Sequence, residues 1–198
     1  TAWDEESHSQ QAESGYVAAE LALGPEPGQT DAAWWREWLA IQSRKMSLYY
    51  GLARLEEMQA LAERCRPVVE QYGTARQRGE YHRGLQMLGL RREHFAVSAL
   101  TVAEGQAAVE AFREAGDDND LTLTISGLGF TLLWAGRLDE AEAPMLEGLE
   151  RTERAGDVAV LSRVLTYLHE EICAALAAEL EPGELAASVQ QLPLDDLV

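Results

Sequence analysis

The chain has 198 residues, of which 46% are hydrophobic and 25% charged, a composition that is ordinary for a folded, water-soluble protein with a sizeable core. Its formal net charge of −18 argues against direct nucleic-acid binding, because the phosphate backbone would be repelled. No run of about 18 apolar residues occurs, so no membrane span is predicted. Because the chain begins at Thr1 without a methionine, we expect it to be part of a longer protein. Cys65 and Cys173 are expected to be free thiols, which indicates the reducing environment of the cytoplasm.

The N-terminal segment is predicted to be a separate helix. Within residues 1–23, Ala12, Tyr16, Ala19 and Leu23 recur at spacings of four, three and four residues, which is one face of a helix. Residues 24–31 hold two prolines and two glycines and form a linker, because such a run cannot continue a helix.

Residues 32–178 are predicted to form stacked helix pairs. A first helix runs from Ala32 to a turn at residues 51–53, and a second, containing Pro67, runs to Gly73. Further helices are expected to end near Gly116, Gly136 and Gly156, because glycine accepts the left-handed conformation of a helix cap. The spacing of Gly73, Gly116 and Gly156 indicates a repeat of about 40 residues built from helix pairs.

The last part of this region and the C-terminal segment are less regular. A helix from Val158 is predicted to bury Leu161, Val164, Leu165, Leu168 and Ile172. Residues 179–198 are expected either to cap the last repeat or to form a free tail, and their end, Leu192-Pro-Leu-Asp-Asp-Leu-Val198, is acidic and apolar.

One helix pair, residues 120–157, carries the spacing of a known repeat. Leu128-Gly129, a turn glycine at Gly136 and Ala141 stand where two helices cross, and Gly148 keeps a second crossing position small. The stretch resembles a tetratricopeptide repeat, with Ile125, Leu132 and Met145 in place of the usual aromatic residues. The resemblance implies an all-α fold, a right-handed superhelix of stacked antiparallel helix pairs with about seven helices.

Three stretches point to a particular class of proteins that contain such repeats. They are Ala33-Trp-Trp-Arg-Glu-Trp-Leu39 followed by Tyr49-Tyr50, then residues 66–74, then residues 132–142. They look like the C-terminal repeats of large bacterial signalling proteins in which an AAA/STAND-type ATPase is coupled to a cyclase-like or transcriptional output domain. The resemblance implies a regulatory segment that binds a protein, a peptide or an effector, without a cofactor, and with any nucleotide hydrolysis elsewhere in a parent chain. Self-association that holds a multidomain assembly together, as a homo-oligomer, is the alternative.

Six residues are candidates for partner binding. Arg76, Arg83 and Arg91 are seven and eight residues apart, so they share one helix face, apart from the stripe of Tyr81, Leu85 and Leu88. They lie in the segment 64–94, which holds seven arginines against three glutamates, and an acidic partner segment is therefore the expected ligand. Pairing of these arginines with neighbouring acids is the competing interpretation. Trp34, Trp38 and Tyr49 are the expected apolar contacts, or else they pack against residues 1–23 and the second helix.

No catalytic or metal-binding motif is found in the sequence. His169 and Cys173 are one helical turn apart but lack the further ligands that a structural zinc ion requires. Neither a phosphate-binding loop nor a nucleophile motif occurs, so no enzymatic activity is predicted.

Overall fold

The computed structural model describes residues 2–26, 31–94, 96–156, 162 and 165–166, with side chains from residue 11 onward. Seven helices, and no strand, occur in these residues: α1 (Ala2–Leu23), α2 (Ala32–Gly51), α3 (Leu55–Tyr72), α4 (Ala75–Arg92), α5 (Ala99–Ala115), α6 (Asp118–Trp134) and α7 (Leu138–Ala155). The prediction of an all-α fold is confirmed. The helix expected from Val158 onward, and the C-terminal segment 179–198, lie outside the described residues.

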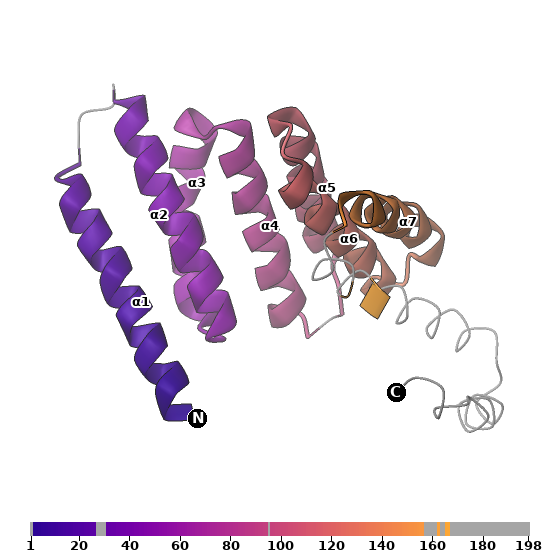
Figure 1. Cartoon of the computed structure of the whole chain (residues 1–198), viewed down its shortest axis with the longest axis horizontal. Coiled ribbons are helices and arrows are strands. Elements are labelled where there is room, and N and C mark those ends of the chain that lie inside the picture. The colour runs from indigo at the N-terminus through magenta and orange to yellow at the C-terminus, as the bar shows by residue number, and fades with distance from the viewer. Residues whose placement is uncertain (1, 27–30, 95, 157–161, 163–164, 167–198) are drawn as a thin grey trace.

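The helices follow one another in a row from α1 to α7, as Figure 1 shows. Each helix packs against the next along the chain, and α2 also contacts α4. Short connections, such as residues 52–54 and 135–137, join neighbours into helical hairpins.

Local signals in the sequence explain most helix boundaries. The side chains of Asp31, Thr74, Ser98 and Asp117 each accept a hydrogen bond from a backbone N–H of the first turn of α2, α4, α5 and α6. The prediction that helices end within about four residues of five named glycines, Gly51, Gly73, Gly116, Gly136 and Gly156, is confirmed.

Left-handed backbone conformations mark several of these turns. Gly116, Gly136 and Gly156 have φ values of 69°, 71° and 69°. The turn after α2 uses Ala53 instead, with a φ of 55°, in the position that glycine takes elsewhere.

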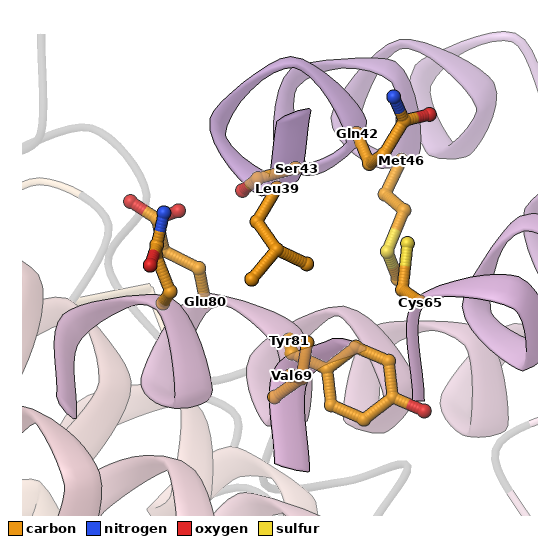
Figure 2. Close-up of a pocket in the computed structure, with 9 residues that line it drawn as sticks. Leu39, Gln42, Ser43, Met46, Cys65, Val69, Glu80 and Tyr81 are labelled. Carbon is orange, nitrogen blue, oxygen red and sulfur yellow. The ribbon is translucent and has the colours of Figure 1, made fainter. Parts of the chain in front are cut away.

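The core is divided into clusters along the row. The first joins α2, α3 and α4 through buried residues that include Leu39, Met46, Met58, Cys65 and Tyr81. Figure 2 shows the small cavity at its centre, which has a volume of about 10 Å³ and is therefore too small for any ligand larger than a water molecule. Two further clusters join α5, α6 and α7 around Phe112, Ile125 and Met145, among others.

Small residues allow α6 and α7 to approach closely, as the repeat spacing predicts. A Cβ atom added to Gly129 would lie 2.5 Å from Cγ of Met145 and 3.3 Å from the carbonyl oxygen of Ala141. A Cβ atom added to Gly148 would lie 3.2 Å from Cβ of Ser126. Backbones this close leave no room for a side chain at either glycine.

The environment of Cys65 gives a first prediction. The thiol is buried in the first cluster, and this burial raises its pKa to about 12, so little thiolate forms in the folded protein. We expect iodoacetamide to alkylate Cys65 at least about a hundredfold more slowly in the folded chain than in guanidinium chloride. Mass spectrometry of the peptide that contains Cys65 measures both rates, and equal rates would contradict the burial.

Candidate functional site

An open groove crosses three helices on one side of the row. It is lined by α2, α4 and α6 and has a volume of about 470 Å³. Its apolar lining consists of Tyr50, Met87, Leu90, Leu123 and Phe130. Pockets of this size and character accept side chains of a ligand.

The groove follows from the spacing of residues on α4 and α6. Arg83, Met87 and Leu90 recur at intervals of four and three residues and form one face of α4. Leu123 and Phe130, two turns apart, form the matching face of α6, while Leu121 and Ile125 of the same helix are buried in the core. Helix α6 is therefore apolar on two sides, and the second side lines the groove.

The base of the groove is fixed by a buried amide. Gln86, with an exposed fraction of 3%, donates from Nε2 to Oγ1 of Thr131 at 2.7 Å and to the carbonyl oxygen of Gly127 at 3.2 Å. These bonds join α4 to α6 directly beneath the lining. They restrict how far the two helices can separate, so the groove is largely preformed.

A charge cluster closes one end of the groove. Arg83 contacts Asp120 at 2.8 Å, and Arg76 contacts Asp120, Asp117 and Glu80 at 3.0, 3.1 and 3.3 Å. Two positive and three negative charges sum to −1, so the arginines are neutralised by acids of their own helix and of the start of α6. For Arg76 and Arg83, the structure shows the pairing that the competing interpretation of the sequence expects.

Arg91 has a different environment. Its guanidinium lies 4.1 Å from the centre of the Tyr50 ring, a cation–π contact between α4 and α2, and it has no carboxylate partner among the described residues. Because Tyr50 lines the groove, this contact places a positive charge beside the apolar lining. Arg83 also stacks over a ring, that of Phe112 at 5.0 Å.

The structure does not bring Trp34, Trp38 and Tyr49 together with the three arginines. Trp34 donates from its indole Nε1 to the carbonyl oxygen of Leu23 at 3.0 Å, and Tyr49 lies 3.4 Å from Glu13, so both contact α1. Trp38 packs against the first core cluster. This arrangement agrees with the alternative that these aromatic residues pack against the N-terminal helix and the core.

Most of the groove lining is not among the residues that the sequence predicts for a binding site. Leu123 and Phe130 lie opposite the face that the spacing of Leu121, Ile125, Leu128 and Leu132 predicts for the core, and Met87 and Leu90 belong to no predicted stripe. The available signal was a second apolar pair on α6, seven residues apart and on the face opposite the core stripe.

Other kinds of site are not seen in the described part of the chain. These residues contain no group of three or more histidine, cysteine or acidic side chains that could hold a metal ion. None of the described helices is long and apolar enough to cross a membrane. The candidate metal pair His169 and Cys173 lies outside the described residues.

Comparison with known proteins adds no relative to these observations. No family model matches the chain, and neither a curated protein nor a solved structure matches it. The groove across α2, α4 and α6 is the feature of the described residues that points to a function.

Proposed function

We propose that the chain is a non-enzymatic regulatory module that binds a peptide segment of a partner protein in the groove across α2, α4 and α6. The observation that carries the proposal is that these three helices are the first members of the hairpins α2–α3, α4–α5 and α6–α7. A groove lined by first helices alone is what a right-handed superhelix of tetratricopeptide-like pairs presents on its concave side. The resemblance to regulatory repeats of bacterial signalling proteins supports the same function.

The side chains that line the groove determine which kind of peptide binds there. Five large apolar residues favour a peptide that buries leucine, methionine or aromatic side chains between the helices. Arg91 and Arg83 lie beside this apolar surface, so acidic residues next to the apolar ones bind better than basic ones. Asp120 offsets part of that attraction, because it already pairs with Arg83 and Arg76.

Selection from a phage-displayed library of random peptides tests this function. We expect the peptides enriched on the full chain to combine large apolar residues with aspartate or glutamate, and their binding to weaken with salt. Replacing Asp120→Asn removes the acid that competes for Arg83, and we expect it to tighten binding of such a peptide roughly three- to tenfold. Fluorescence anisotropy of the labelled peptide measures the change.

The matched control is Asp139→Asn, which removes an exposed acid from α7, away from the groove, and which is expected to leave the affinity unchanged. Enrichment of basic peptides, or equal effects of the two substitutions, would contradict the proposed ligand chemistry.

Self-association is the second candidate function. Leu100, Trp134 and Leu146 expose 69%, 45% and 51% of their surface, and such residues are common in contacts between protein chains. The charge of −18 opposes contact between copies. Light scattering over a concentration series separates the two functions, because only self-association raises the mass with concentration.

A further inference from the structure

Helix α1 is attached to the protein differently from the other helices. None of its described side chains, residues 11–23, is buried, and none belongs to the hydrophobic clusters that join α2 to α7. The predicted stripe of Ala12, Tyr16, Ala19 and Leu23 does face the protein, but each of these residues remains half-buried. Over residues 11–23, apolar burial therefore contributes little to holding α1 in place.

Polar contacts fasten α1 at three levels. The Glu20 carboxylate accepts hydrogen bonds from Nε2 of Gln42 at 2.6 Å and from Nζ of Lys45 at 3.2 Å. Two turns toward the N-terminus, the Glu13 carboxylate accepts hydrogen bonds from Arg54 at 2.9 Å and from the hydroxyl of Tyr49 at 3.4 Å.

At the other end of α1, the carbonyl oxygen of Leu23 accepts the indole N–H of Trp34 at 3.0 Å. In every one of these contacts α1 supplies the acceptor, and α2 or the turn after it supplies the donor.

The hydrogen-bond donors that contact the two carboxylates of α1 form one surface, most of which lies on α2. Gln42, Lys45 and Tyr49 are spaced three and four residues apart, so they share one face of α2, and Arg54 follows in the turn. Gln42 and Lys45 have exposed fractions of only 0% and 8% beneath α1. Glu13 and Glu20 are seven residues, or two helical turns, apart. This spacing lets Glu13 contact Arg54 and Tyr49 while Glu20 contacts Lys45 and Gln42.

Helix α1 leaves one hydrogen-bond acceptor of this surface without a partner. The amide oxygen Oε1 of Gln42 is buried without a hydrogen-bond partner. A helix that offered a donor to this oxygen, in addition to the two carboxylates, would make a contact that α1 lacks. Such a helix has a physical basis for replacing α1.

We propose that the face of α2 bearing Gln42, Lys45 and Tyr49, together with Arg54, is a second binding surface, and that α1 is its exchangeable resident. Its ligand is an acidic helix of a partner protein with two carboxylates two turns apart. This surface is separate from the groove, to which α2 contributes Ser47 and Tyr50. A second copy of the chain is the less favoured source of the helix, because two chains of charge −18 repel each other.

A fluorescein-labelled synthetic peptide with the sequence of residues 11–24 tests the exchange on the full chain. The wild-type chain is expected to bind it weakly, because its own α1 occupies the surface. Replacing Glu20→Ala in the chain removes the carboxylate that holds the resident helix but leaves the peptide intact, so we expect the apparent affinity to rise about tenfold. Adding Lys45→Met to that variant removes the ammonium donor that pairs with the Glu20 carboxylate of the peptide and is expected to abolish the gain.

Controls separate exchange from misfolding. Glu37→Ala removes an exposed charge elsewhere on α2 and is expected to leave peptide binding at the wild-type level. Circular dichroism establishes that each variant keeps its helical structure. If Glu20→Ala does not increase peptide binding in a folded chain, α1 is an integral part of the fold and the proposal is wrong. A doubled mass of the Glu20→Ala chain in light scattering would assign the exchanged helix to a second copy and overturn the assignment to a partner protein.

Discussion

Replacing Gly129→Leu is expected to lower the free energy of unfolding by about 1–3 kcal/mol. The new side chain has no space, because even a Cβ atom would lie 2.5 Å from Cγ of Met145 and 3.2 Å from its backbone nitrogen. Relief requires that α6 and α7 move apart, which would expose Met145 and Ala141, both buried. Chemical denaturation followed by circular dichroism measures the change. A Gly129→Leu variant of full stability would show that the crossing of the two helices is placed incorrectly.

Gly127→Leu, two residues earlier in the same helix, is expected to weaken ligand binding without lowering the stability of the fold. A Cβ atom at Gly127 would meet no atom within 4 Å apart from its chain neighbours and the nearby backbone of its own helix, and the residue lines the groove, so the leucine projects into the space proposed for the ligand. Because glycine within a helix costs about 0.5–1 kcal/mol relative to alanine, stability is expected to remain the same or to rise slightly. Binding of a peptide selected on the wild-type chain is expected to fall at least about tenfold, since the leucine and the ligand cannot occupy the same volume.

Gly127→Ala is the matched control for this prediction. It gives the same gain in helix propensity but adds only a methyl group, so we expect increased stability with binding within about threefold of the wild type. Denaturation curves and anisotropy titrations of the two variants give both quantities. A Gly127→Leu chain that is fully folded and still binds the peptide with wild-type affinity would place the binding site elsewhere.

The sequence predicts the helices well, because their limits depend on local residues. Asp31 and Thr74 cap helix starts within one turn of themselves, and Gly116 and Gly156 end helices through their own backbone conformation. The close crossing at Gly129 was also predictable, since the repeat spacing places a small residue opposite Ala141.

The partners of the arginines could not be predicted in the same way. Arg76 and Arg83 share a helix face, as their spacing indicates, but the acids that neutralise them, Asp117 and Asp120, lie about 40 residues further along the chain. Which acids face which arginines depends on how α4 packs against the start of α6. An excess of arginines in one segment is compatible with a row of available arginines or with pairing to acids, and the structure pairs Arg76 and Arg83 but leaves Arg91 without a carboxylate partner among the described residues.

The groove depends on the same long-range packing. It requires that α2, α4 and α6 lie beside one another, and Leu123 and Phe130 have meaning only in that arrangement. The aromatic residues of α2 depend on long-range packing too. Their number on one helix is compatible with a binding surface or with packing, and only the structure shows that Trp34 and Tyr49 contact α1.

The position of a bound peptide shows directly whether the groove across α2, α4 and α6 is the binding site. A peptide selected on the full chain, carrying a benzophenone in place of one apolar residue, is crosslinked by light, and mass spectrometry identifies the modified residues. We expect crosslinks to the groove residues of α2, α4 and α6, above all Met87, Leu123 and Phe130, and their loss in the Gly127→Leu chain. Crosslinks that fall on α3, α5 or α7, and that persist in the Gly127→Leu chain, would contradict this expectation.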